Sequence, residues 1–420
     1  MGGSGKAFGP ALNFSDPRAV SLFWAKSMET YIGTGAKTGP SADVAVTEAT
    51  KSALAFLGRA KPSYGFLFAS PDLDLRVALA TAKELSGAEI IGCTTAGEIT
   101  DAGPTRGGVA VMLVASDATT TVQMASGLKA NPERAARELA SSLSQTKKAA
   151  AGYEQRNLTT VLLTDGLAGT GERVVSELYG SRIQSGTQIV GGAAGDDGRF
   201  TATLVGATGK ASVDAAVALH VFSARRWGIG VKHGLRPTTK QMRVTKADGN
   251  VVFEIENQPA FAAYERHAAA RGIALTADNA SAYMIANELG VHFFERIGRA
   301  RAPLSVGPGG SLVCAAEVPR GSMVSILDGD PESMVSAARA AAEEARDSLD
   351  GGPAAGILLF DCVCRGMILK TDFRREVDAV RSVFPDVPIA GFLTYGEIAR
   401  SHDKLDGWHN ATAVVVAIPR

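Results

Sequence analysis

The chain contains 420 residues, of which 45% are hydrophobic and 20% are charged. That length predicts two or three domains, and the composition is sufficient for ordinary hydrophobic cores. The 43 basic and 43 acidic residues give a formal net charge of zero, which excludes a strongly basic surface for nucleic acid or anionic membranes.

No apolar run approaches the roughly 20 residues that span a bilayer, and no secretory pattern opens the chain. We therefore expect a cytoplasmic protein of bacterial type that has neither a nucleic-acid nor a membrane partner. Residues 1–37 are punctuated by Gly, Ser and Pro, and we expect a flexible leader there, with one short helix around Ala19–Tyr31.

Three units with a shared order of elements follow the leader. The predicted helices are Val44–Leu57, Leu73–Leu85, one starting at Asn131-Pro132, Glu172–Gln184, one over Glu332–Leu349 capped by Asp330, and Phe373–Phe384. The predicted strands are Tyr64–Ala69, Ala88–Ile91, Gly108–Ala115, Thr160–Thr164, Gln188–Val190, Ala215–Phe222, Gly356–Asp361, Val387–Ala390 and Ala411–Ile418. These repeated β-α-β-β units predict an α/β fold in which mixed sheets are flanked by helices.

A segment of different character separates the second unit from the third. It opens with a predicted hairpin, Met242–Lys246 and Val251–Ile255, joined through Asp248-Gly249. Its predicted helices are Pro259–Arg271 and Asn279–Leu289, and its later strands are Val291–Arg296, Ser311–Glu317 and Met323–Leu327. We place the main domain boundary near Ala224-Arg225-Arg226, where the last strand of the second unit ends.

One turn sequence occurs twice after a predicted strand. Gly391–Ile398 repeats Gly92–Ile99 at five of eight positions, and Gly195-Asp196 is a degenerate third copy. Glycine permits positive φ and close approach of other atoms to the backbone. The acids Glu98 and Glu397 have two interpretations, contact with a ligand ammonium group or bracing of their own turns by accepting backbone N–H groups.

Other polar residues near strand ends are weaker candidates. Asp196-Asp197 offers oxygen ligands for a cation, although two adjacent carboxylates alone do not build a Mg²⁺ or Ca²⁺ site. Arg365 is a candidate anion partner at a strand end, the place where open α/β sheets bind ligands.

The four cysteines raise the question of thiol chemistry. If Cys362-Val363-Cys364 lies in a strand, the two thiols share a face and can meet one substrate or metal; the alternative is two small core side chains. Cys93 or Cys362 as a nucleophile is the enzyme alternative. No Cys–His pairing and no Gly-x-Ser-x-Gly motif supports it, so we expect that the chain is not an enzyme.

Several motifs together resemble the FIST family of sensory domains, with an N-terminal and a C-terminal module. The matching stretches are Gly92–Ile99, Val190–Asp197, Gly228–Pro237, Asp248–Phe253, Leu359–Cys362 with Arg365, Gly391–Ile398 and His409–Thr412. They extend over nearly all of residues 40–420. The resemblance implies an N-terminal module over residues 38–224 and a C-terminal module over residues 225–420.

The resemblance also implies a function, that of an intracellular small-ligand sensor in signal transduction. The implied output partner is a separate histidine kinase or cyclic-di-nucleotide signalling enzyme. We expect the ligand at the turns and strand ends, in contact with Thr95, Gly97, Glu98, Asp196, Asp197, Arg365, Thr394, Tyr395 and Glu397.

The identity of the ligand has two alternatives. One branch of free-standing FIST proteins binds haem and senses nitric oxide, and the chain is similar to that branch in length and layout. A haem sensor needs an axial ligand, usually His, and His233 occupies the matching position; its structural alternative is to anchor the entry to the hairpin. The remaining histidines are His220, His267, His292, His402 and His409. The second alternative is an amino acid or another small metabolite, bound without haem.

Overall fold

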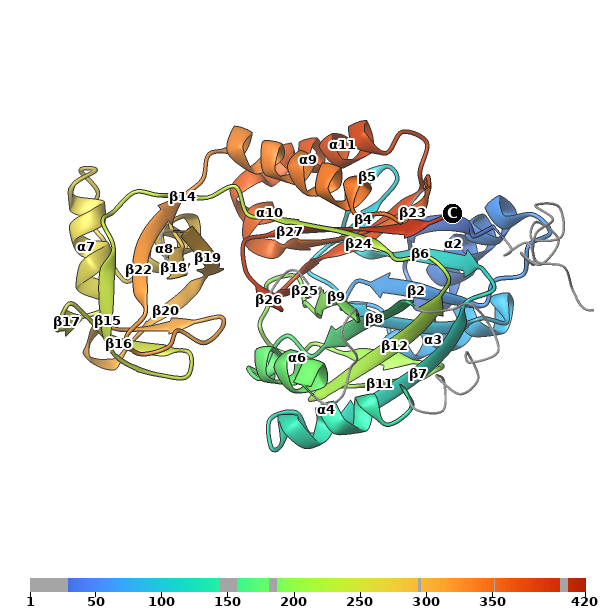
Figure 1. Ribbon diagram of the computed structural model, residues 1–420, viewed down its shortest axis with the longest axis horizontal. Coiled ribbons are helices and arrows are strands. Elements are labelled where there is room, and N and C mark those ends of the chain that lie inside the picture. Colours follow the sequence, from blue (N-terminus) through green and yellow to red (C-terminus); the bar gives the residue numbers. More distant parts are fainter. Residues whose placement is uncertain (1–28, 144–156, 181–186, 294–295, 351, 401–406) are drawn as a thin grey trace, which may run out of the picture.

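The computed structural model describes residues 29–143, 157–180, 187–293, 296–350, 352–400 and 407–420. The chain forms a large body of three six-stranded sheets flanked by helices, and a small lobe built on a nine-stranded sheet (Figure 1). The predicted α/β class, with mixed sheets and two modules, is confirmed. Among the described residues, no helix is both long enough and apolar enough to cross a membrane.

The first unit begins inside the predicted leader. Tyr31–Thr38 is strand β1, so the expectation of a flexible segment as far as residue 37 is wrong there, while residues 1–28 and most of the predicted helix Ala19–Tyr31 lie outside the described residues. Gly33 and Gly35 are in β1 because the first helix packs directly on it. A Cβ on either glycine would lie 2.0 Å from a carbonyl oxygen of that helix. The unit comprises β1, α2 (Ala42–Leu57), β2 (Tyr64–Ala69), α3 (Leu75–Ser86), β3 (Glu89–Thr94) and β6 (Gly108–Ala115).

The second and third units repeat this order. The second comprises β7 (Thr119–Ser126), α4 (Pro132–Ala140), β8 (Asn157–Thr164), α6 (Gly171–Gly180), β9 (Gln188–Ala193) and β12 (Ala215–Ser223). The third comprises β13 (Gly228–Lys232), α9 (Pro331–Asp347), β23 (Ala354–Cys362), α10 (Val363–Leu369), the 3-10 turn η2 (Lys370–Phe373), α11 (Arg374–Val383), β24 (Ile389–Thr394) and β27 (Ala413–Pro419). The predicted N-caps are confirmed, since Asn131 Oδ1 accepts a hydrogen bond from Arg134 N and Asp330 Oδ1 accepts one from Ser333 N.

The strands that follow the three Gly-acid turns leave their own unit. β4 (Glu98–Thr100) and β5 (Gly103–Thr105) of the first unit extend the sheet of the third. β10 (Val205–Ala207) and β11 (Lys210–Ser212) of the second extend the first, and β25 (Glu397–Arg400) and β26 (Trp408–His409) of the third extend the second. Each sheet is therefore completed by a neighbour, and the exchange closes in a ring of three.

The repeated glycine before each turn has a steric cause. In each unit two central strands run parallel, β2 with β3, β8 with β9, and β23 with β24. A Cβ on Gly92, Gly191 or Gly391 would lie 2.3, 1.9 or 1.8 Å from the carbonyl oxygen of the leucine paired with it on the adjacent strand. Any side chain there would push the paired strands apart.

The lobe is an insertion between the first strand and the first helix of the third unit. Its helices are α7 (Phe261–Ala269) and α8 (Ala280–Ala286), with the 3-10 turn η1 (Pro308–Gly310). Its strands are β14 (Arg236–Pro237), β15 (Met242–Asp248), β16 (Val251–Ile255), β17 (Gln258–Pro259), β18 (Leu289–Phe293), β19 (Arg296–Arg301), β20 (Pro303–Gly307), β21 (Ser311–Cys314) and β22 (Met323–Asp328). The lobe has a hydrophobic core of its own, around Val244, Tyr264 and Met284.

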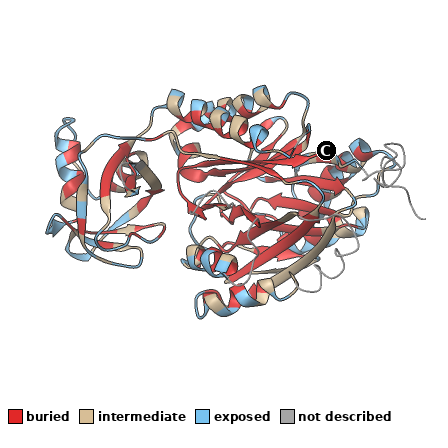
Figure 2. Cartoon of the chain, in the orientation of Figure 1, coloured by how far each residue is buried: buried red, intermediate tan, exposed pale blue. Residues whose placement is uncertain are grey.

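Burial differs between the strands of the body and the helices that cover them. The strands at the centre of the body are buried along most of their length, whereas the outer faces of the helices are exposed (Figure 2).

One predicted detail about the cysteines is wrong. Cys362 is the last residue of β23 and Val363 starts α10, so Cys362 and Cys364 do not share a strand face.

Candidate functional site

The three Gly-acid turns meet inside the body. We call the residues Thr95–Glu98, Ala194–Asp197 and Thr394–Glu397 the turn centre. Backbone hydrogen bonds join the turns in pairs: Leu393 N to Gly97 O at 2.8 Å, Asp197 N to Thr95 O at 3.1 Å, and Tyr395 N to Ala193 O at 3.1 Å. The structure thus brings together eight of the nine residues that the sequence proposed for ligand contact.

The two glutamates of the turn centre are buried and accept hydrogen bonds from nearby threonine hydroxyls and backbone N–H groups. Glu98 accepts hydrogen bonds from Thr95 Oγ1 at 2.7 Å and from Gly108 N at 3.4 Å. Glu397 accepts them from Thr394 Oγ1 at 2.5 Å and from Thr412 N at 3.1 Å. Burial raises the pKa of Glu98 to about 7 and that of Glu397 well above its usual range. These contacts favour the bracing interpretation of both acids.

The two aspartates of the third turn differ from each other. Asp196 accepts hydrogen bonds from Phe200 N, Thr201 N, Ala202 N and the Tyr395 hydroxyl. Burial acts to raise the pKa of Asp196, but these hydrogen bonds hold it below the usual value. A carboxylate with this many donors is not free to bind a cation. Asp197, in contrast, has positive φ and a buried Oδ1 without a hydrogen-bond partner among the described residues.

Arg365 belongs to none of the three turns; it lies in the first turn of α10, and its donors are occupied. Its Nε and Nη2 bond to Glu376, and Nε also lies 3.0 Å from Asp361 Oδ1. Its Nη groups bond to the carbonyl oxygens of His233 at 2.7 Å and Met334 at 2.9 Å. The expectation of a free anion partner is therefore corrected, because this guanidinium clamps the body to the linker that leads into the lobe.

His233 does not fit the role of a haem axial ligand. Its Nδ1 accepts a hydrogen bond from Leu235 N at 2.9 Å, so the neutral ring carries its proton on Nε2 and has no free lone pair there. Burial, with Arg365 and Lys232 nearby, lowers the pKa of His233 to about 4. The contact with Leu235 fits the anchoring alternative.

The other described histidines also form hydrogen bonds within the protein. His220, His267, His292 and His409 each have a ring nitrogen bonded to another protein group, and His402 lies outside the described residues. Within the described ranges, no cluster of three or more His, Cys, Asp or Glu residues could hold a metal ion.

An acid that the sequence analysis did not single out lies where the lobe meets the body. Glu288, just before β18, is 1% exposed, and neither of its carboxyl oxygens has a hydrogen-bond partner among the described residues. The Cys364 thiol, a weak donor, lies beside this carboxyl and acts to lower its pKa. Burial raises the pKa of Glu288 to about 8. An isolated acid between the apolar runs of α8 and β18 was the only sign in the sequence.

Glu288 belongs to a contact region that we call the lobe junction, with Glu172, Arg301, Cys364 and Trp408. Arg301 of the lobe is fully buried and donates to Glu172 Oε1 at 3.1 Å and to the Trp408 carbonyl at 3.5 Å. Glu172 and Trp408 line a cavity of about 20 Å³, and their buried Oε2 and Nε1 atoms have no hydrogen-bond partner within the described chain. Such atoms are rare in proteins and need an explanation.

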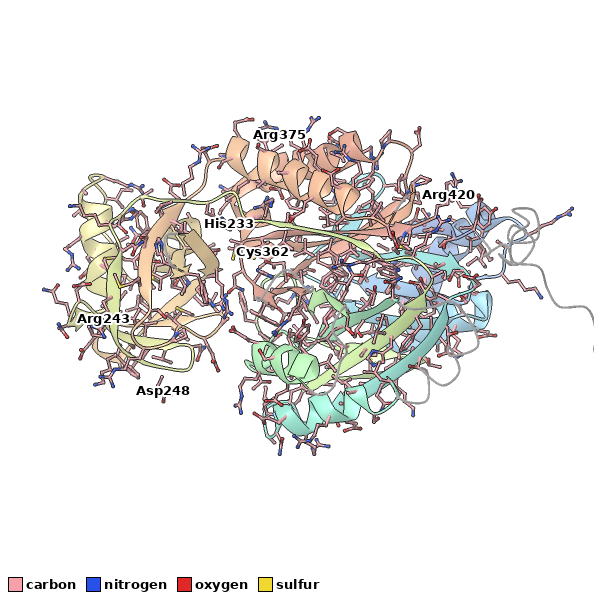
Figure 3. The ribbon with its side chains drawn as sticks, in the orientation of Figure 1. His233, Arg243, Asp248, Cys362, Arg375 and Arg420 are labelled. Atoms are coloured by element: carbon pink, nitrogen blue, oxygen red, sulfur yellow. The ribbon has the colours of Figure 1, made fainter. Side chains whose placement is uncertain are left out.

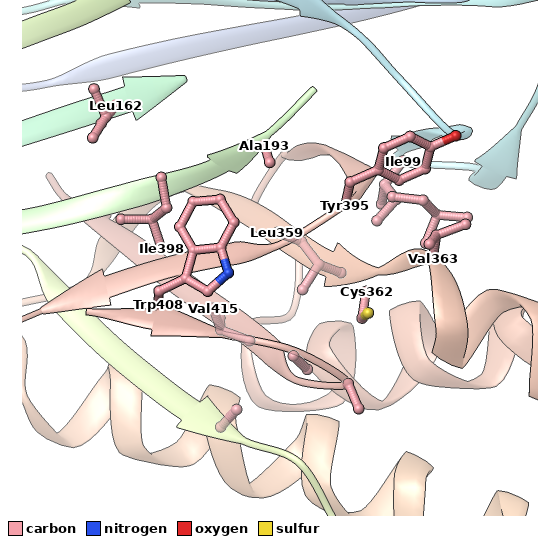
Figure 4. Close-up of a cluster of buried hydrophobic side chains, with 14 of the residues drawn as sticks. Ile99, Leu162, Ala193, Leu359, Cys362, Val363, Tyr395, Ile398, Trp408 and Val415 are labelled. Atoms are coloured by element: carbon pink, nitrogen blue, oxygen red, sulfur yellow. The ribbon is translucent and has the colours of Figure 1, made fainter. Parts of the chain in front are cut away.

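The lobe junction joins residues of the lobe, Glu288 and Arg301, to residues of the body. His233 and Cys362 lie on the side of the body that faces the lobe (Figure 3). Trp408, Cys362 and Tyr395 belong to one cluster of buried side chains that reaches from the lobe junction to the turn centre (Figure 4). Packed side chains therefore connect the lobe junction with the turn centre.

Comparison with known proteins identifies related sequences over most of the chain. Residues 63–258 match the FIST N domain and residues 260–400 match the FIST C domain. A segment of 76 residues, 18% of the chain, is 37% identical to an uncharacterized protein of Methanocaldococcus jannaschii and covers 15% of that protein's length. A solved structure of cyanuric acid hydrolase aligns with 94% of this chain and 100% of its own, at 11% identity and a TM-score of 0.33. A likeness at that level carries no functional inference.

Proposed function

Because the chain belongs to the FIST-domain family, whose domains are associated with small-ligand sensing in signal transduction, we propose that it binds a small amine-bearing metabolite at the lobe junction. The observation that carries this proposal is the buried carboxyl of Glu288, which no N–H or O–H donor of the described residues reaches. Burying an acid without a partner is costly, and a ligand ammonium group would supply the missing donors.

The position of Glu288 suggests how binding becomes a signal. The lobe joins the body through only two linkers, one around Gly234 and the other around Gly329, and it has its own core. Glu172 of the body forms ion pairs with Arg299 at 2.7 Å and Arg301 at 3.1 Å, which hold the lobe closed. A ligand between lobe and body would shift the balance between open and closed arrangements.

The contacts of the histidines support the ligand class without haem. Haem held by His233 requires a lone pair that this ring does not offer, so the proposal is a sensor without haem. A separate histidine kinase or cyclic-di-nucleotide enzyme as output partner rests on the family alone.

We also propose that the chain is not an enzyme. All four cysteines are buried, and burial raises the pKa of the Cys93 thiol well above its usual value and that of Cys314 to about 12. Reactive cysteines are nucleophilic as thiolates, which these surroundings disfavour.

A thermal-shift screen of primary amines and amino acids against the full chain tests the proposal. At least one compound should raise the unfolding midpoint in a concentration-dependent manner, more at pH 8 than at pH 6, because the cation binds the ionised form of Glu288. Glu288→Gln should abolish the shift, whereas Glu265→Gln, an exposed position on α7, should leave it unchanged. A shift that survives Glu288→Gln would place the ligand elsewhere.

A further inference from the structure

A second cavity lies at the end of the body away from the lobe. It is open to solvent and is lined by the start of β1 in the first unit and by the start of β23 and the loop before β24 in the third. Its volume is about 710 Å³, and a neighbouring cavity of about 230 Å³ shares Thr34 and Asp101 with it. Arg420, at its rim, and the lobe lie at opposite ends of the molecule (Figure 3). The larger volume is within the range of small-molecule sites.

The walls of this cavity contain large apolar side chains that are left in water. Phe56, near the end of α2, is 77% exposed and Tyr31 is 42% exposed. Pro385 and Pro388 line the side contributed by the third unit. Flat apolar surfaces of this kind favour a ligand with an aromatic body, since covering them removes apolar area from water.

The polar groups still available in the cavity are mainly donors. The Asp101 carboxylate is already used, because it accepts hydrogen bonds from Thr34 Oγ1 and from Ile389 N at 2.7 Å. Arg381 Nη2 donates to the Asp101 carbonyl oxygen and lies 4.0 Å from Asp101 Oδ1, which orients the guanidinium, and the side chain remains 42% exposed. Arg420 adds a second cationic side chain, and Asp386 is the one free acid among the described lining residues.

From this combination we infer that the cavity binds a small aromatic carboxylate, with Arg381 as its main partner. Arg381 Nε is buried, so its terminal Nη groups are the ones that can donate to a ligand, and an oriented guanidinium of this kind suits a carboxylate. The cavity shares no residue with the lobe junction, so this inference does not depend on the proposed sensor site.

Isothermal titration of 1-naphthoate into the full chain tests this inference. We expect saturable binding at one site and at least tenfold weaker binding of the neutral analogue 1-naphthalenemethanol. Arg381→Gln should weaken naphthoate binding at least tenfold. The control Arg374→Gln, on the same helix but outside the cavity lining, should leave it unchanged.

A second variant guards against loss of folding. Phe56→Ser replaces a side chain that is 77% exposed, so the fold should persist while naphthoate binds more weakly. Glu288→Gln should leave naphthoate binding unchanged, which separates this site from the lobe junction. Absence of saturable binding, equal binding of the neutral analogue, or full affinity in both Arg381→Gln and Phe56→Ser would overturn the inference.

Discussion

The turn centre and the lobe junction both hold buried acids, but the acids differ in what surrounds them. Glu397 at the turn centre accepts two hydrogen bonds from N–H and O–H donors, whereas neither oxygen of Glu288 at the lobe junction has such a partner among the described residues. Both are almost completely removed from water. The two acids therefore differ in whether hydrogen-bond donors surround them, and not in how deeply they are buried.

This difference has a topological origin. At the turn centre Glu98 and Glu397 each begin a strand that joins the sheet of another unit, so the surrounding backbone supplies donors. Glu288 precedes β18 in the inserted lobe, which two linkers connect to the body. Its environment is completed only by contact between two separately folded parts. We interpret the turn centre as scaffold and the lobe junction as the place where a ligand can alter the molecule.

The largest expected effect comes from disturbing the scaffold at its glycines. In Gly391→Ala the new Cβ would lie 1.8 Å from the Leu359 carbonyl oxygen, so β23 and β24 must separate. We expect a loss of more than about 4 kcal/mol of unfolding free energy, or no folded protein at all. Urea unfolding measures the loss.

Gly58→Ala is the contrasting control, because Gly58 has positive φ but nothing lies within 4 Å of its added Cβ, whereas Gly391 is blocked by the Leu359 carbonyl and has no positive φ. It should cost only about 1 kcal/mol. Similar losses in the two variants would contradict the steric explanation of the repeated turn.

A smaller effect is expected from Glu397→Gln. The substitution keeps the shape but replaces one acceptor oxygen by a donor, so either Thr394 or Thr412 loses its acceptor. The expected cost is about 1–3 kcal/mol for one unsatisfied buried group. Urea unfolding should show this loss while the affinity for an amine ligand stays at the wild-type value; a reduced affinity would return Glu397 to the ligand site.

Much of the scaffold could be predicted from the sequence because its signals are local. The N-caps Asn131 and Asp330 and the repeated Gly-acid turns each depend on a few neighbouring residues. The same local logic failed at β1, where Gly33 and Gly35 indicated a flexible leader. Those glycines are present because α2 approaches the strand, a contact that no short window of sequence reveals.

The exchange of strands between units and the position of Glu288 were beyond prediction for a related reason. Both depend on which distant segments become neighbours. The pattern identified the Gly-acid turns but neither the strands β4 and β25 that begin at their acids nor the sheets that these strands join. Glu288 differs from a surface acid only through the burial that the lobe and the body create together. Arg365 does not have its expected role as an anion partner, because its donors bond to protein groups that are distant in the sequence.

A last expected effect, spread over several pH units, concerns the pH dependence of stability at the lobe junction. Since burial raises the pKa of Glu288 to about 8, the folded state holds a proton that the unfolded state releases near pH 4.5. The stability present below pH 4.5 is therefore lost as the pH rises towards 8, by at most about 1.4 kcal/mol per pH unit. Glu288→Gln removes this contribution, so its unfolding free energy relative to wild type should increase between pH 5.5 and 7.5. Chemical denaturation at several pH values measures the trend, with Glu265→Gln as the control that should run parallel to wild type. Parallel profiles for Glu288→Gln and wild type would mean that Glu288 is already satisfied in solution, and the contrast between the two regions would disappear.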